Sequence, residues 1–387
     1  MINKKKHQVK YWVGRIHLWL GLTSGLFVCF LGITGCILAF QREIEDAVQS
    51  YRYAEIRNEP LLPPSEIQKI ANRELPDKEA HSISYQDGRA SIVSYFKEGE
   101  DYYWTVFVNP YSGEVLKVKD MAWDFFRIMI MGHYYLWLPP GIGQPVLATA
   151  TLMFTFLLFS GLILWWPKNK AASKKRFSIK WNARWRRVNY DLHNVLGFYM
   201  TWILIFLAIS GLVMGFQWFA KSVYWVSSGG KQMIPFEESI SKSAADANLV
   251  AHAAGKSPAE DVLWAMARAK RPGFEGSMDV HPPHSKTSSV EISVNPDPGT
   301  YWKADYLFYD QYTLEEIEVK HMYGKLANAT AADKLARMNY DIHVGAVLGL
   351  PGKIMAFLAS LVAASLPITG FIIWRGRHKK KKQKQIV

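Results

Sequence analysis

The residues most clearly able to carry out chemistry in this sequence are four histidines at the ends of long apolar segments. They are His17, His133, His193 and His343. Ionisable side chains are costly in apolar segments of membrane-spanning length, and those found there usually serve a function. A single histidine at a helix end could merely cap the helix or bond a neighbour. Four histidines at matching positions predict that they bind a metal or a haem.

The positions of these histidines sort them into two pairs. His17 and His193 begin their apolar segments, and at 1.5 Å per residue Phe40 lies about 35 Å beyond His17, on the far side of a bilayer. His133 and His343 precede their segments on that far side, just before Pro/Gly breaks. We therefore expect one histidine pair near each membrane face, with the paired helices diagonally opposite.

The number of ligands indicates which cofactor these pairs suit. Zinc would need four ligands, and no Cys, Asp or Glu stands near the histidines in the spans to complete the set. Asp191 and Asp341 precede His193 and His343 by two residues, which turns them off the ligand face. Haem b needs only two axial imidazoles. Because no Cys-x-x-Cys-His motif occurs, the sequence predicts two non-covalent haem b groups with the four histidines as iron ligands.

A flat macrocycle also needs space and partners for its propionates. Glycines close to the histidines, such as Gly21 and Gly197, permit a close approach. Arginines near the predicted membrane surfaces are expected to bind the propionates, and they are Arg15, Arg187, Arg127 and Arg337. The same arginines could instead act only as charges that orient the helices in the membrane.

Four uncharged blocks are long enough to cross a bilayer, which takes about 20 apolar residues in a helix. They predict an integral membrane α-helical protein with four transmembrane helices and two extracytoplasmic α+β insertions. The predicted segments are the cytoplasmic N-terminus and first helix (1–41), the first outer domain with the His133 segment (42–137), the second helix (138–166), a basic cytoplasmic loop (167–191), the third helix (192–220), the second outer domain (221–345), the fourth helix (346–374) and a basic cytoplasmic tail (375–387).

The basic residues gather beside these helices. Residues 1–15, 167–187 and 375–387 contain 21 Lys and Arg and no acid, although the net charge of the whole chain is only +13. This pattern is typical of a multi-pass protein of a bacterial cytoplasmic (inner) membrane with both termini in the cytoplasm. Because the charge flanks membrane helices, we expect membrane lipid as a partner and no nucleic acid.

The sequence repeats itself with an offset of 176 residues. His17 corresponds to His193, and Ile33-Thr34-Gly35 corresponds to Ile209-Ser210-Gly211. A Ser/Thr-Gly pair occurs in each of the four spans and is typical of close helix packing in lipid. These matches predict two tandem repeats, each consisting of a helix, an insertion and a second helix.

Each insertion is predicted to place one helix on a small antiparallel sheet. The first offers a helix at 64–73 and alternating strand patterns at 81–95, 102–108 and 114–118. The second offers a helix near 259–269 and strands at 288–294, 303–309 and 314–319.

These features together resemble the PepSY-associated transmembrane family of iron-regulated inner-membrane proteins, which includes FoxB/PiuB-type ferric-siderophore reductases. The resemblance covers nearly the whole chain. It rests on Gly14-Arg-Ile-His17, the turn at 109–116, Tyr190-Asp-Leu-His193 and Tyr340-Asp-Ile-His343. It implies PepSY-like insertions, b haem on the bundle histidines and delivery of electrons to ferric chelates outside.

The leading hypothesis is therefore an oxidoreductase that passes electrons across the membrane and reduces Fe(III) in a ferric siderophore to Fe(II), for iron release on the periplasmic side. No Rossmann fingerprint occurs, so we expect an unidentified electron donor, a quinol or a cytoplasmic reductase. Two alternatives stay open. One is a haem redox subunit that feeds another electron-transfer enzyme, and the other is a non-redox PepSY membrane sensor or protease regulator.

Overall fold

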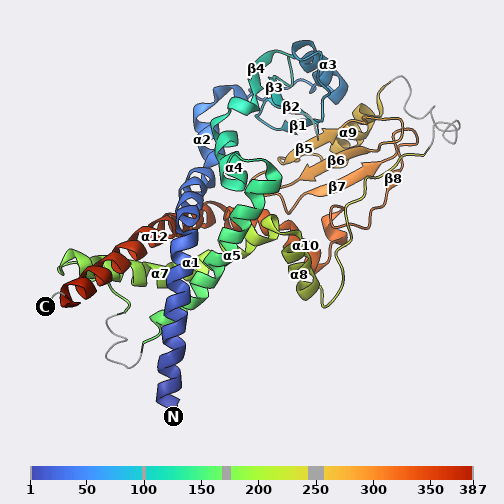
Figure 1. Ribbon diagram of the computed structural model, residues 1–387. Helices are drawn as coiled ribbons and strands as arrows, with labels where there is room; N and C mark the ends of the chain where they lie inside the picture. Colours follow the sequence, from blue (N-terminus) through green and yellow to red (C-terminus); the bar gives the residue numbers. More distant parts are fainter. Residues whose placement is uncertain (1, 98–101, 168–175, 243–256, 386–387) are drawn as a thin grey trace. The chain divides into compact units, whose positions relative to one another are not determined.

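The chain folds into two compact units (Figure 1), and the computed structural model describes residues 2–97, 102–167, 176–242 and 257–385. The helix bundle contains Met1–Gln41, Ile128–Val223 and Asn339–Val387. The sheet unit contains Arg42–Arg127 and Tyr224–Met338. Part of the predicted basic loop, 168–175, lies outside the described residues.

Four long apolar helices make up the helix bundle. They are α1 (Ile2–Ala39), α5 (Pro140–Trp165), α7 (Trp185–Gly215) and α12 (Gly349–Gln385). Each contributes a stretch that is long and apolar enough to cross a membrane, which confirms the four predicted spans. The chain is therefore a membrane protein.

Each of these helices packs along two of the others. Helix α1 lies against α5 and α12, and α7 lies against the same two helices, so that α1 and α7 are diagonal to each other. Small residues permit the contact, since a Cβ at Gly32 of α1 would lie 2.7 Å from the backbone oxygen of Ser360 in α12. Side chains of α5, α7 and α12 fill the centre, among them Leu158, Leu204 and Ala363.

Two short helices beside the spans carry His133 and His343. Helix α4 (Phe125–Tyr135) precedes α5, and α11 (Asn339–His343) with the 3-10 turn η4 (Ala346–Leu348) precedes α12. The chain turns after α11 through Gly345 and Gly349, whose positive φ angles cost glycine little. After α4 it turns through Leu136 and Trp137, where positive φ is unfavourable and must be held by packing.

The sheet unit is built on one eight-stranded antiparallel sheet with the order β4-β3-β2-β1-β5-β6-β7-β8. The first insertion supplies β1 (Ser82–Gln86), β2 (Ser91–Phe96), β3 (Tyr103–Val108) and β4 (Val115–Asp120). The second supplies β5 (Ser277–His281), β6 (Val290–Asn295), β7 (Asp305–Tyr309) and β8 (Glu316–Ile317).

Helices α3 (Pro64–Glu74) and α9 (Ala259–Ala269) pack against one face of this sheet. The alternation along each strand turns its apolar side chains toward them, as with Ile83 and Val280, which are paired across β1 and β5 and fully buried. The other short helices within the described residues are α2 (Gln41–Val48), η1 (Ser50–Arg52), η2 (Met121–Trp123), α8 (Gln217–Ser227), η3 (Leu326–Asn328) and α10 (Ala331–Arg337).

The structure departs from the sequence prediction where the two insertions meet. Two separate small domains were expected, whereas β1 and β5 pair antiparallel and make one continuous sheet. Strand β5 had not been predicted at all, although the helix at Ala259–Ala269 was. The physical reason is that each insertion alone would expose an open strand edge, and pairing the two edges satisfies their backbone groups.

Candidate functional site

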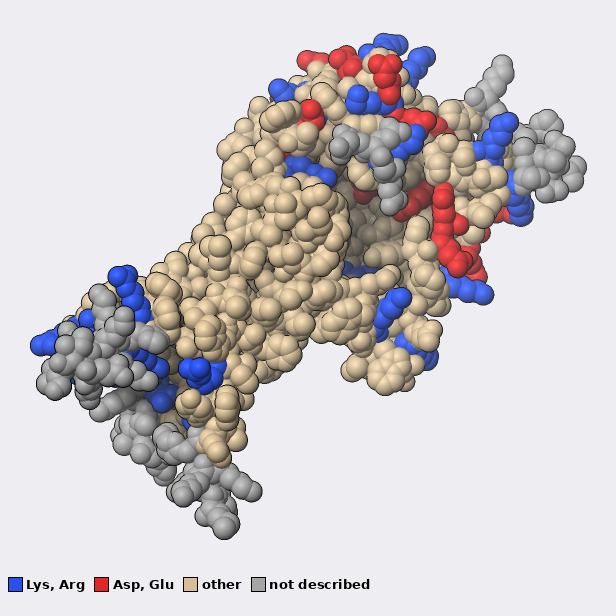
Figure 2. All heavy atoms as spheres, in the orientation of Figure 1, with Lys and Arg blue, Asp and Glu red and all other residues tan. Residues whose placement is uncertain are grey.

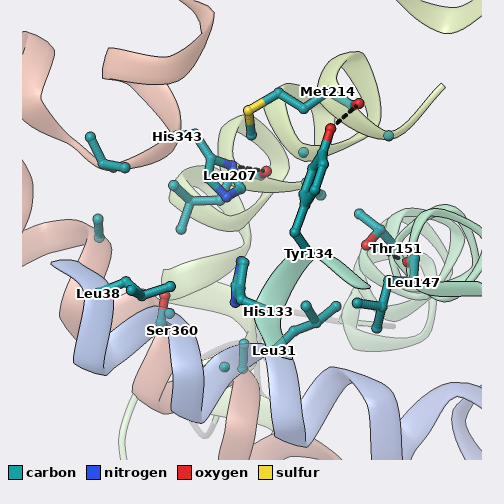
Figure 3. Close-up of a pocket in the computed structure, with 18 of the residues that line it drawn as sticks. Leu31, Leu38, His133, Tyr134, Leu147, Thr151, Leu207, Met214, His343 and Ser360 are labelled. Carbon is teal, nitrogen blue, oxygen red and sulfur yellow. Dashed lines mark hydrogen bonds between the residues drawn. The ribbon is translucent and has the colours of Figure 1, made fainter. Parts of the chain in front are cut away.

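The four histidines of the bundle lie on four different helices. His17 belongs to α1, His193 to α7, His133 to α4 and His343 to α11. The rings of His133 and His343 have centroids 6.2 Å apart and line one cavity, where Figure 3 shows His343 beside Leu207. His17 and His193 lie close enough to interact electrostatically. The structure thus brings the histidines together in the two combinations His133–His343 and His17–His193.

Each imidazole hydrogen-bonds a serine or threonine hydroxyl of a neighbouring span through its Nδ1 atom. The Nδ1–Oγ distances are 2.8 Å for His17 and Ser160, 2.7 Å for His133 and Thr34, 2.9 Å for His193 and Thr369, and 3.0 Å for His343 and Ser210. The same arrangement therefore occurs four times, once in each span.

The direction of these bonds follows from the other bonds of the hydroxyls. Each hydroxyl donates its own proton to a backbone carbonyl three or four residues earlier in its helix, as Thr34 does to Phe30 and Ser210 to Phe206. The hydroxyl must then accept from the imidazole, so Nδ1 carries the proton. His343 supports this assignment independently, because its Nδ1 also bonds the carbonyl oxygen of Leu207, which can only accept. In this tautomer each Nε2 carries a lone pair that could bind a metal, and the hydrogen bonds found for these four rings within the described residues all use Nδ1.

A glycine follows each of these hydroxyl residues and makes room for the ring. A Cβ at these positions would approach the Cε1 atom of the adjacent histidine, to 3.6 Å at Gly161, 3.7 Å at Gly35, 3.2 Å at Gly370 and 3.3 Å at Gly211. The Ser/Thr-Gly pairs, which the sequence indicated only as helix-packing positions, thus also seat the histidines. Their recurrence in all four spans, each with one histidine, was the signal that could have revealed this role.

The donor set decides which group fits between the rings. In the described parts of the chain, no group of three or more His, Cys, Asp or Glu could hold a metal ion. Two imidazoles alone suit a haem, because the porphyrin supplies the other four ligands. The ring centroids of His133 and His343 lie 6.2 Å apart, so a metal placed between the two imidazoles would be within reach of both. The residues present therefore fit haem b.

The surroundings of His133 and His343 suit an apolar macrocycle. The cavity has a volume of about 250 Å³ and is partly open. Small and aliphatic side chains of the spans dominate its lining. At its wall the Tyr134 hydroxyl donates to the Met214 carbonyl (Figure 3), and the side-chain amide of Gln144 donates to both of these groups.

The two histidine pairs occupy different levels of the bundle. Thr34, which holds His133, follows His17 by 17 residues along α1, and Ser210, which holds His343, follows His193 by the same number along α7. At 1.5 Å per residue the two levels are about 25 Å apart. A pair near each end of the spans is therefore a geometric property of the bundle.

The four arginines expected near propionates occupy different environments. Arg15 is exposed on α1, and Arg187 forms a 2.9 Å ion pair with Asp191 on α7. Arg127 and Arg337 belong to the sheet unit, where their guanidinium groups lie 5.3 Å from the ring centroids of Tyr103 and Tyr306, respectively. Arg337 is buried and donates to the carbonyl groups of Ala304 and Gly324. Propionate binding by these arginines stays a prediction.

The chain is similar over nearly its whole length to a known protein family. A family model described as the PepSY-associated TM region matches residues 14–377, which is nearly the whole chain. A search of curated proteins found no match.

Proposed function

Because the chain belongs to the family described as the PepSY-associated TM region, and because its spans seat four histidines alike, we propose that it is a haem b-containing membrane reductase. In this proposal two haem b groups are held by His17 with His193 and by His133 with His343. The substrate is a ferric siderophore, whose Fe(III) is reduced to Fe(II) so that the iron is released.

The observation that carries the proposal is the shared hydrogen bonding of the histidines. All four imidazoles donate from Nδ1 to a hydroxyl, and no hydrogen bond found within the described residues uses their Nε2 atoms, although each ring lies among apolar helices. Four part-buried imidazoles would gain little structural stability from acceptor nitrogens that make no hydrogen bond within the described residues. The arrangement is the one in which a histidine ligand is oriented by a partner on its second nitrogen.

Haem b, when bound at these pairs, would supply one-electron redox chemistry. The protein residues would fix the orientation of the imidazoles, exclude water and set the iron potential through the histidine bonds. Siderophores bind Fe(III) far better than Fe(II), so one electron per iron is enough to release the metal.

The proposed orientation places both termini in the cytoplasm and the sheet unit in the periplasm of an inner membrane. It rests on the basic segments beside the spans. The electron donor would then be a quinol or a cytoplasmic reductase, because the sequence lacks a dinucleotide-binding fingerprint.

Absorption spectroscopy of the purified protein tests the proposal. Pyridine haemochrome assay against protein concentration should give two haems b per chain, and the dithionite-reduced protein should be reoxidised by added ferric siderophore under anaerobic conditions. A protein without haem bands would overturn the proposal and favour the sensor or regulator hypothesis. Two haems that ferric siderophore does not reoxidise would instead favour a subunit feeding another enzyme.

A further inference from the structure

A seven-residue pattern occurs twice, once before each of two histidines. It reads Arg187-Val-Asn-Tyr-Asp-Leu-His193 in α7 and Arg337-Met-Asn-Tyr-Asp-Ile-His343 through α11. The asparagines, Asn189 and Asn339, precede their histidines by four residues. That spacing places each asparagine and its histidine on the same face of a helix.

Each asparagine bonds the residue that its histidine bonds. The Nδ2 atom of Asn189 donates to the backbone oxygen of Thr369 at 3.1 Å, and Thr369 also accepts from His193 through its hydroxyl. The Nδ2 atom of Asn339 donates to the backbone oxygen of Ser210 at 3.1 Å, and the Ser210 hydroxyl accepts from His343. Two adjacent side chains of one helix thus hold the two polar groups of a single residue on another helix.

The other two histidines lack this second contact. The residues four positions before His17 and His133 are Val13 and Met129, whose side chains cannot donate a hydrogen bond. In each histidine pair, therefore, one ring bonds a hydroxyl residue that an asparagine of the same helix also bonds. The other ring bonds a hydroxyl residue without a contact from the side chain four positions before the histidine. Asn189 is 1% exposed, so water does not compete for its bond to Thr369.

We infer that Asn189 and Asn339 are positioning residues, each of which fixes one histidine ligand of a haem site. Each does so by donating a hydrogen bond to the backbone oxygen of the residue whose hydroxyl accepts from that histidine. The inference rests on the proposed function. The physical reason is that the Nδ1–hydroxyl bond can orient the imidazole only if the two helices keep a fixed position relative to each other. The asparagine bond fixes this position at the residue that carries the hydroxyl. Groups that orient a ligand in this way typically change metal affinity by about tenfold to a hundredfold when removed.

The test compares matched leucine variants of the purified full-length protein. Asn339→Leu removes the amide donor at nearly constant size, and Met129→Leu makes a matched change at the equivalent position before His133. The readouts are the rate of haem transfer to an excess of a haem-scavenging apoprotein and the low-spin ferric EPR signal. Asn339→Leu should release one of its two haems at least about tenfold faster than wild type and shift one EPR signal. Met129→Leu should match wild type in both.

A second comparison separates positioning from general destabilisation. In a His193→Ala background, which leaves only the His133–His343 site, Asn339→Leu should still accelerate haem loss, whereas Asn189→Leu should not. If Asn339→Leu does not accumulate in the membrane, Asn339→Ala and Met129→Ala replace the leucine pair.

The outcomes distinguish this inference from the proposed function. Equal haem-loss rates and EPR signals for the Asn339 and Met129 variants would overturn the positioning role while leaving two haems in place. Wild-type protein without haem would overturn the proposed function itself.

Discussion

A serine or threonine hydroxyl beside each histidine ring is the smallest feature on which the proposed haem sites depend. The hydroxyl accepts the Nδ1 proton and thereby selects the tautomer whose Nε2 can bind iron. In an apolar bundle, an Nδ1–H group left without an acceptor costs about 1–3 kcal/mol. Removing a single hydroxyl is therefore expected to disturb the tautomer and orientation of the histidine, with a much smaller effect on the stability of the helix that carries the hydroxyl.

Thr34→Val tests this at the His133 seat, where the hydroxyl lies 2.7 Å from Nδ1. Valine keeps the shape of threonine and removes the acceptor, so we expect haem affinity at that site to fall about tenfold to a hundredfold. Thr34→Ser should retain wild-type affinity. Thr155→Val is the matched control, because the hydrogen bond that the Thr155 hydroxyl makes within the described residues runs to the Thr151 carbonyl of its own helix. Haem-to-protein ratio and haem-loss rate measure the effect, and equal ratios for Thr34→Val and Thr155→Val would contradict it.

At the scale of the elements, each span contributes a glycine that brings its backbone close to an imidazole on another helix. In α12 this residue is Gly370, where a Cβ would lie 3.2 Å from the Cε1 atom of His193. The same helix carries Gly376, where a Cβ would have no neighbour within 4 Å. Helix α12 therefore contains one glycine at which an added methyl group would contact a histidine ring and one at which it would contact nothing among the described residues.

Gly370→Ala is expected to push the His193 ring from its seat and to lower the haem count from two toward one. Gly376→Ala should keep both haems, and it controls for the general effect of alanine on helix stability. Pyridine haemochrome assay of the two purified variants gives the answer. A full haem complement in Gly370→Ala would show that this glycine does not limit the position of the ring.

The sheet also contains an element-scale feature, a pair of acidic residues near the β1–β5 junction. Burial, followed by the charge of Asp279, raises the pKa of Glu291 from 4.5 to about 7. Burial likewise raises the pKa of Asp279, which accepts from Ser84 and Ser293. Glu291 lies opposite His281 in the pairing of β5 and β6. The folded sheet therefore binds a proton on Glu291 more tightly than the unfolded chain does.

This difference predicts how stability varies with pH. The contribution of protonated Glu291 is complete below about pH 4.5 and is lost as the pH rises toward 7. We expect the loss to amount to about 1–3 kcal/mol, since Glu291 is only part-buried. Glu291→Gln should remove this part of the pH dependence, whereas Glu114→Gln, at an exposed position, should keep it. Thermal unfolding of the full chain between pH 4.5 and 7 measures the slopes, and equal slopes for wild type and Glu291→Gln would refute the assignment.

At the scale of the whole molecule, the proposed direction of electron transfer depends on membrane orientation. Figure 2 shows that basic residues gather around the end of the helix bundle near the chain termini, whereas both acidic and basic residues occur on the sheet unit. Because basic segments favour the cytoplasmic side, the sheet unit is expected to face the periplasm.

Cysteine labelling tests this orientation in a background with Cys29 and Cys36 replaced by alanine. Single cysteines at the exposed positions Ser112 and Ser285 of the sheet unit should react with a membrane-impermeant maleimide in intact spheroplasts. A cysteine at Ser178, exposed beside the basic loop, should react only after permeabilisation. The reverse pattern would place the sheet unit in the cytoplasm and exclude a periplasmic substrate.

Features of this protein that depend on local composition and periodicity can be predicted from the amino-acid sequence. Uncharged apolar blocks longer than about 20 residues can hardly be anything but spans, and the structure has four such helices. The helix predicted at 259–269 likewise coincides with α9, because its apolar spacing has few alternatives. The four histidines could be selected because ionisable groups are rare in such segments.

The contacts that these residues make could not be predicted in this way, because they form between distant parts of the chain. The Ser/Thr-Gly pairs are 99 to 176 residues away from the histidines they hold, and no local pattern specifies which hydroxyl meets which ring. The pairing of β1 with β5 likewise joins two insertions that are separated in sequence by two spans. Both arrangements depend on how helices and strand edges pack over long sequence distances, and the free energy of that packing is set by the whole fold.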